Sequence, residues 1–293
     1  MIAYNHYIDF IPKLTEERAV AGSFAHILTV KESPPFDLSE KLEYKIEFFR
    51  NQGRTLSLYF EREYSRTQEG RLWALVVEDV VSFFWESGTK TLCYMAGEGL
   101  SERLLEYWTL HIALPLFFTI EESYDFLHAG AVEVDGKPIL FTAESFGGKS
   151  TVTGFFLRRG HRMISDDKVA FYEEGGQLFA IPSHPHHRPH RKMEDLGHFI
   201  ENIALNPKPI YAIYELEKVK PNASIEITEL HGIEKFKSLR YSSDINLSFL
   251  KVKRFVFLSH LAKAVPLYRV TLPWDIERLD EVYDVICEHK FSF

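Results

Sequence analysis

The fold expected for this chain is decided by residues 126–168, FLHAGAVEVDGKPILFTAESFGGKSTVTGFFLRRGHRMISDDK. Two apolar segments, Phe126–Val134 and Pro138–Ala143, flank Asp135-Gly136, which favours a hairpin turn with positive φ at both central positions. The second segment runs into Gly147-Gly148-Lys149-Ser150-Thr151 and then into a short helix, which Gly160 is placed to end. The pattern predicts a hairpin whose second strand feeds a glycine-containing loop and a helix start.

A loop of this kind is suited to hold phosphate. The first backbone N–H groups of a helix are unpaired and carry partial positive charge, and glycines let the backbone approach an anion closely. Lys149 is placed to reach the terminal phosphates of a nucleotide, and the Ser150 hydroxyl to bind Mg²⁺. Compared with G-x-x-x-x-G-K-[ST], the segment departs at Ala143. The expected nucleotide-binding residues are Ser145, Phe146, Gly147, Gly148, Lys149, Ser150 and Thr151.

Two adjacent aspartates, Asp166-Asp167, close the short strand that directly follows this helix. An ordinary P-loop NTPase usually places its metal-binding acid much further along the chain, and most nucleotide-binding folds enter the loop from a parallel strand. Taken alone, the pair is more often a capped turn than a catalytic site. Together with the loop, it predicts a distinct class of phosphoryl-transfer fold.

The segments LHAGAVEVDGKPILFTAESFGGKST and RRGHRMISDD resemble the C-terminal catalytic domain of the HPr kinase/phosphorylases and related bacterial and archaeal serine kinases. The resemblance is close from Leu127 to Val169, and it implies a fold shared with phosphoenolpyruvate carboxykinase. It further implies that His128 lies at the active site, that Asp166 is the base on the acceptor hydroxyl, and that Asp167 binds the metal with Ser150. The chain departs from the family at Phe146, where glycine is usual, and at Ala143, often glycine. The family's later glycine-rich metal-ligand motif is not found.

Composition is that of a soluble protein. The chain has 293 residues, 45% of them apolar, and a formal net charge of −8, which speaks against nucleic acid as a general partner. Its 2 cysteines give no disulfide framework and suit a reducing cytoplasm. The N-terminus lacks the features of a signal peptide, and the longest apolar run is too short to span a membrane. We therefore expect a cytoplasmic protein without a membrane partner, and a homo-oligomer stays open.

The rest of the chain predicts a mixed α/β protein with two domains. Residues 1–120 read as a β-rich region closed by a helix from Ser101 to Phe118, and residues 121–293 as the nucleotide-binding domain. Aromatic residues of the first region, among them Trp73 and Trp85, favour a core over a ligand surface. The later elements expected are a hairpin around Gly175-Gly176, strands at Ile210–Glu215, Ser224–Glu229 and Leu267–Leu272, and helices at Leu250–Ala264 and Ile276–Glu288.

The histidine-rich segment Ser183–Lys192, SHPHHRPHRK, has three interpretations. A zinc site is disfavoured because the prolines prevent a helical histidine pair and no cysteine or carboxylate stands at ligand spacing. A solvated surface loop is one alternative. The other is an active-site loop in which Arg188 and Arg191 bind a phosphate or an acidic substrate group through their guanidinium forks.

The function predicted from these residues is transfer of a phosphoryl group to a hydroxyl, with ATP or another purine nucleotide and Mg²⁺ as cofactors. The expected catalytic residues are Asp166, His128, Lys149, Arg188 and Arg191, with Ser150 and Asp167 as metal ligands. The acceptor expected is a serine of a protein or peptide. Alternatives are a small-molecule hydroxyl such as free serine, a nucleotide-binding regulator without turnover, and an interaction protein in which the loop has no role.

Overall fold

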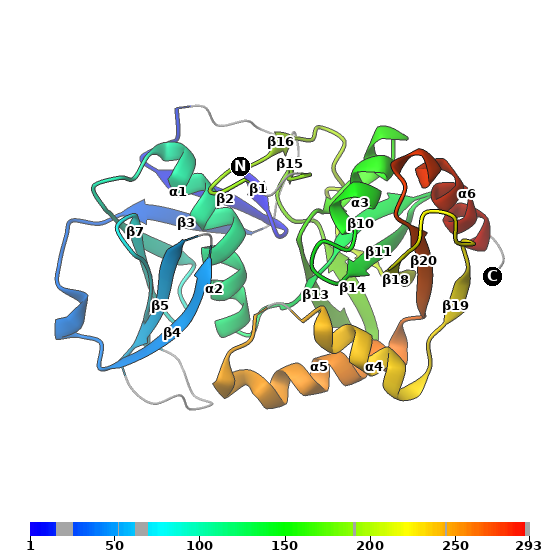
Figure 1. Ribbon diagram of the computed structural model, residues 1–293. Coiled ribbons are helices and arrows are strands. Elements are labelled where there is room, and N and C mark those ends of the chain that lie inside the picture. Colours follow the sequence, from blue (N-terminus) through cyan, green and yellow to red (C-terminus); the bar gives the residue numbers. More distant parts are fainter. Residues whose placement is uncertain (16–25, 52, 62–69, 190–191, 244, 291–293) are drawn as a thin grey trace. The chain divides into compact units, whose positions relative to one another are not determined.

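The computed structural model describes residues 1–15, 26–51, 53–61, 70–189, 192–243 and 245–290. The chain divides into two compact units (Figure 1). The first unit comprises Met1–Glu122 with Arg191–Leu196, and the second comprises Ser123–His190 with Gly197–Phe293. The segment Arg191–Leu196 therefore belongs to the first unit although its neighbours in sequence belong to the second.

The first unit is built on an eight-stranded sheet in the order β1-β2-β3-β8-β7-β6-β5-β4. Strands β2, β3, β7 and β8 alternate buried and more exposed residues, as expected where one face packs on the core, whereas β5 and β6 each contain three consecutive buried residues. Trp73 and Trp85 are fully buried, which confirms that these aromatics are core residues. The strands are β1 Ile2–Ala3, β2 His6–Ile11, β3 Ile27–Glu32, β4 Tyr44–Asn51, β5 Arg54–Phe60, β6 Leu72–Val77, β7 Val81–Glu86 and β8 Thr91–Ala96.

One interrupted helix completes the first unit. It begins at the predicted cap Ser101, whose hydroxyl accepts a hydrogen bond from the Leu104 amide, and runs as α1, Glu102–Trp108. A π-helical turn at Thr109–Ala113 separates it from α2, Leu114–Ile120. Pro115 lies in the first turn of α2, where its missing N–H is tolerated. The helix expected from Ser101 to Phe118 is therefore present as two α-helical parts joined by a π-helical turn.

The second unit is a mixed α/β structure, as the sequence predicted. Its six-stranded sheet has the order β12-β10-β11-β18-β20-β19, and β11 pairs antiparallel with β10 but parallel with β18. A four-stranded sheet, β17-β14-β13-β9, and a two-stranded sheet, β15-β16, complete it. The strands are β9 Asp125–His128, β10 Gly130–Val134, β11 Lys137–Ala143, β12 Arg162–Ser165, β13 Lys168–Glu174, β14 Gln177–Ile181, β15 His186–His187, β16 His198–Phe199, β17 Lys208–Pro209, β18 Ala212–Val219, β19 Ile227–Glu229 and β20 Leu267–Pro273.

The predicted hairpin is present, but its first arm serves two sheets. Asp135 and Gly136 both have positive φ, as the turn requires, and they join β10 to β11. The segment Phe126–Val134 is not one strand, as the sequence suggested. Its first part, β9, leaves the hairpin before the buried Ala129 and pairs with β13 in the four-stranded sheet. Because of this change of sheet, His128 pairs with Lys168 of β13 and so lies close to Asp167.

The six-stranded sheet is covered on both faces (Figure 1). Alternate residues of β11 point to opposite sides: Leu140 joins the core under α5, Lys251–Ala264, while Ile139 and Phe141 join the core under α3 and α6. Helix α3 is Lys149–Arg158, α4 is Gly232–Tyr241 and α6 is Leu279–Lys290. Burial on both faces makes this sheet a rigid support for the loop at the end of β11.

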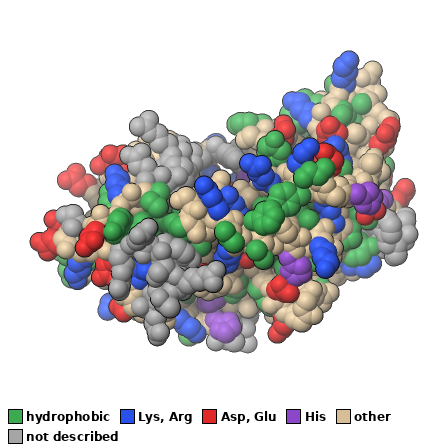
Figure 2. Space-filling model, turned by 90° about the horizontal axis from the view of Figure 1, so that it is seen from below, with side chains coloured by type: hydrophobic (Ala, Val, Ile, Leu, Met, Phe, Trp, Pro, Cys, Tyr) green, Lys and Arg blue, Asp and Glu red, His purple; other side chains and the backbone are tan. Residues whose placement is uncertain are grey.

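Helices α4 and α5 lie on the side shown in Figure 2, where apolar side chains are interspersed with lysines and arginines. The exposed apolar residues of these helices are Ile233, Tyr241, Val252, Phe255 and Val256. Helix α4 was not predicted, whereas α5 matches the expected Leu250–Ala264 closely. None of the helices in the described part of the chain has the length and apolar character needed to cross a bilayer.

Replacing Phe156 by alanine tests the packing of α3 on the sheet. Phe156 is fully buried, with its ring centre 5.0 Å from that of Phe141 and 4.8 Å from that of Tyr283. We expect Phe156→Ala to lower the free energy of unfolding by about 3–5 kcal/mol, since it leaves a cavity between helix and sheet. Urea unfolding followed by circular dichroism measures this. The largely exposed Phe255 provides the control, and a similar loss for Phe255→Ala would contradict the observed packing.

Candidate functional site

The glycine loop connects the end of β11 to the start of α3, as the sequence predicted. Gly148 precedes the helix with φ of 91°, a conformation that favours glycine, and a Cβ there would lie 2.7 Å from a methyl carbon of Leu272. The Gly147 amide donates to the Glu144 carbonyl, which closes the turn before the helix. The amides that begin α3 point out of the helix end, so the loop has the partial positive charge that an anion site needs.

Phe146 takes the conformation that a glycine would take at the tip of this loop. Its φ is 61°, and the residue is 89% exposed. The ring therefore lies in solvent and does not fill the loop. Phenylalanine in place of the family's usual glycine is thus not damaging on steric grounds. Ser145 and Thr151 are also exposed, and Ser150 is partly buried.

Lys149 connects the loop to the aspartate pair. It is only 5% exposed, and its ammonium donates to the Asp166 carbonyl at 3.1 Å and to the Asp167 carboxylate at 3.2 Å. His128 approaches the same aspartate, with Nδ1 3.3 Å from Asp167 Oδ1 and 3.1 Å from the Asp167 carbonyl. The structure thus brings together three residues that the sequence assigned to one site, Lys149, Asp167 and His128.

Asp166 points to different partners. It is 3% exposed; His187 Nδ1 lies 2.7 Å from Oδ1, and the Arg188 amide donates to Oδ2 at 2.8 Å. Burial works to raise the pKa of Asp166, but the hydrogen bond and charge of His187 and the charge of Lys149 outweigh it and hold the pKa below its usual range. Asp166 is therefore ionised at neutral pH, so His187 Nδ1 carries the proton in this bond.

The His187 ring reaches Asp166 because α3 has a glycine beside it. A Cβ on Gly154 would lie 2.8 Å from His187 Nε2. Glycine in a helix interior costs about 1 kcal/mol relative to alanine. The space that it leaves lets the imidazole lie between the helix and the aspartate. The sequence did not predict this role for His187, because the histidines of the segment were considered only as zinc ligands and the active-site interpretation named only Arg188 and Arg191.

The histidine-rich segment is not a solvated loop over the part that the structure describes. Ser183, His184, His186, His187 and Arg188 are all buried, so that alternative is wrong for Ser183–Arg188. Burial, and secondarily the neighbouring His186, lowers the pKa of His184 to about 3, so this histidine is neutral at physiological pH. His190 and Arg191 lie outside the described residues, so the expectation for Arg191 stays a prediction.

The donor set suits Mg²⁺ better than zinc. Within the described ranges, no three His, Cys, Asp or Glu side chains gather to hold a metal by themselves. Magnesium usually takes one or two protein oxygens and completes its shell with water and nucleotide phosphates. The Ser150 hydroxyl and the Asp167 carboxylate have the right chemistry for such a shared site, whereas zinc requires three or four protein ligands.

Comparisons with known proteins link the chain to one group of kinases. No family model matches the chain. An HPr kinase/phosphorylase from Clostridium botulinum (strain Eklund 17B / Type B) is 32% identical over 96 residues, which cover 33% of this chain and 30% of that protein. The HPr kinase/phosphorylase from Clostridium beijerinckii is 44% identical over 52 residues, or 18% of this chain and 17% of that protein.

A solved structure, "Structure of the Hpr(Ser) kinase/phosphatase from Coxiella burnetii", aligns with 56% of this chain and 98% of that chain. Its identity is 16% and its TM-score 0.33, so this likeness bears on neither the fold nor the function. The match to the curated relatives spans less than a third of their length. Within that span, the resemblance expected from the sequence is confirmed: the chain is HPr kinase-like over about a third of its own length.

Proposed function

We propose that this protein is an ATP- and Mg²⁺-dependent kinase that transfers a phosphoryl group to a serine hydroxyl of a protein or peptide. The observation that carries the proposal is the contact of Lys149 with both aspartates. Its ammonium lies 3.1 Å from the Asp166 carbonyl and 3.2 Å from the Asp167 carboxylate. A phosphate-binding loop and an acid pair in direct contact are what phosphoryl transfer requires.

The loop residues Gly147–Thr151 bind the phosphates through their amides, and Lys149 turns from Asp167 to the terminal phosphate. Lysine is a flexible point charge, so this exchange of partners needs rotation of one side chain. Ser150 and Asp167 hold Mg²⁺, which when bound neutralises charge on the phosphate oxygens. His128 keeps Asp167 oriented, which gives this histidine a positioning role.

Asp166 accepts the proton of the acceptor hydroxyl. The hydroxyl oxygen then forms a bond to the terminal phosphorus, and the bond from that phosphorus to the bridging oxygen breaks, releasing the nucleoside diphosphate. A carboxylate oxygen has two lone pairs, so Asp166 can accept this proton while it keeps its bonds to His187 and the Arg188 amide. Its lowered pKa keeps it in the ionised form that a base needs.

Arg188 and Arg191 supply further positive charge in this proposal. The Arg188 amide donates to the Asp166 carboxylate, and Arg188 is buried, so its backbone is held close to this acid. An arginine held in a stiff segment loses little entropy when it meets a phosphoryl oxygen. Arg191 is proposed for the same role on the basis of the sequence alone.

Removal of the Lys149 ammonium tests nucleotide binding. In wild type, MgATP at about a hundredfold excess over its Kd should stabilise the protein by about 2.7 kcal/mol, seen as a rise in Tm. The rise should be absent in Lys149→Ala and normal in Lys263→Ala, which removes an exposed lysine from α5. The ligand-induced shift is compared within each variant, since loss of the buried lysine also changes the nucleotide-free Tm. Equal shifts in both variants would refute the assignment.

Asp166→Asn tests the base. Transfer from radiolabelled ATP to a panel of serine peptides and to free serine should fall by about 10²–10⁴-fold, the usual contribution of a general base. MgATP affinity, measured by calorimetry, should stay close to that of wild type. Asp167→Asn should in addition raise the Mg²⁺ concentration needed for activity. Near-normal transfer by Asp166→Asn would place the base elsewhere, and transfer to free serine alone would replace the peptide acceptor by a small molecule.

A further inference from the structure

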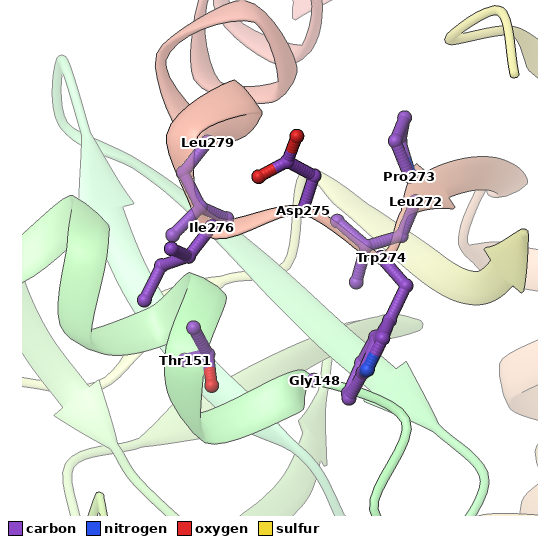
Figure 3. A pocket seen from close by; sticks show the side chains of 8 residues that line it. All are labelled: Gly148, Thr151, Leu272, Pro273, Trp274, Asp275, Ile276 and Leu279. Atoms are coloured by element: carbon purple, nitrogen blue, oxygen red, sulfur yellow. The ribbon is translucent and has the colours of Figure 1, made fainter. Parts of the chain in front are cut away.

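A cavity of about 260 Å³ lies beside the start of α3 (Figure 3). It is formed on one side by Gly148 and Thr151 and on the other by the segment that follows β20, with Leu272, Trp274 and Ile276. Pockets for whole drug-sized ligands measure about 300–1,000 Å³, so this cavity suits one part of a larger molecule.

The cavity and the phosphate-binding loop share their residues. Gly148 precedes the helix whose first amides bind anions, and Thr151 lies in the first turn of that helix. The backbone of Gly148 is so close to the cavity wall that an added Cβ would lie 2.7 Å from Leu272 and 3.5 Å from the Trp274 ring. A molecule whose phosphates bind these amides therefore has its remaining part next to this cavity, which can bury it.

The lining is chemically unlike a phosphate site. Trp274 is 46% exposed, and Lys218 Nζ lies 3.6 Å from its ring centre, so the lysine covers one face of the indole. Figure 3 shows Trp274 beside Gly148 and Ile276 toward Thr151. Among the lining residues Asp275 alone is charged, and its negative charge disfavours phosphate. The cavity is suited to a planar, uncharged group that packs against an aromatic ring.

This wall is held in place by its own hydrogen bonds. The Trp274 amide donates to the Val219 carbonyl, and the Asp275 carboxylate caps the short turn that follows by accepting from the Glu277 amide. A preorganised aromatic surface loses less entropy on binding than a mobile one.

We propose that this cavity receives the base and ribose of the nucleotide donor, with the base stacked on Trp274. The inference rests on the proposed function, because the phosphates of the same nucleotide occupy the loop at Gly147–Thr151. It assigns to Trp274 the part of the affinity that depends on the base and not on the phosphates. Stacking of a base on an aromatic side chain tolerates different bases, so adenine and guanine nucleotides should both gain affinity from Trp274.

The experiment compares MgATP with magnesium tripolyphosphate, which carries the phosphates without base or ribose, by titration calorimetry. Trp274→Ala should weaken MgATP binding by about tenfold, the order of loss for one stacked base, and leave tripolyphosphate binding unchanged. Trp274→Phe should retain most of the MgATP affinity. Tyr241→Ala, which removes an exposed aromatic from α4, should bind both ligands as wild type does.

Tryptophan fluorescence gives a second readout. Of the 4 tryptophans, Trp73, Trp85 and Trp108 are fully buried, so a change of emission with MgATP but not with tripolyphosphate should come from Trp274 and be lost in Trp274→Ala. Unchanged MgATP affinity in Trp274→Ala, while Lys149→Ala loses both ligands, overturns the inference and leaves the proposed function standing. Equal weakening of both ligands by Trp274→Ala overturns it too. Failure of wild type to bind either ligand overturns the proposed function and the inference together.

Discussion

The ammonium of Lys149 is the interaction on which the candidate site depends. A buried charge without partners is strongly unfavourable, and this one is satisfied by the Asp166 carbonyl and the Asp167 carboxylate. The contact ties the first residue of α3 to the turn between β12 and β13. This contact holds the start of α3 and the two aspartates at a fixed separation within the second unit.

Around this contact, each aspartate has its own set of partners. Asp167 shares its carboxylate between Lys149 and His128, whereas Asp166 is held by His187 and the Arg188 amide. Two adjacent carboxylates repel each other, and separate donors to each offset this repulsion. The two carboxylates also differ in exposure: Asp167 is partly exposed, whereas Asp166 is buried. In the proposed function, this difference lets Asp167 exchange the lysine for a metal ion while Asp166 keeps its partners.

Local signals in the sequence predicted the elements that carry the loop. Asp135-Gly136, the glycines before Lys149, Gly160 and Gly175-Gly176 each mark a turn through their own backbone preference, and the structure has a turn at each. The partner of Asp166 was not predictable in this way. His187 is brought to it by β15, and its place depends on Gly154 on the opposite side. Contacts between residues this far apart in the sequence depend on tertiary packing, which no local sequence pattern indicates.

The same limit explains the errors elsewhere. Phe126–Val134 reads as one apolar strand, because nothing in its sequence marks the change of sheet at the buried Ala129. The segment after Arg188 reads as part of the second domain, yet Glu194 accepts hydrogen bonds from Trp108 and Arg54 and so belongs to the first unit. Trp274 was unremarkable in the sequence, since its significance comes from its position beside Gly148.

A crystal structure with Mg²⁺ and a non-hydrolysable ATP analogue tests the central claim most directly. The account predicts the phosphates on the amides of Gly147–Thr151, Lys149 on the terminal phosphate, and the metal between that phosphate, Ser150 and Asp167. A nucleotide bound away from this loop, or Lys149 still bonded to Asp167 with the nucleotide in place, would contradict it.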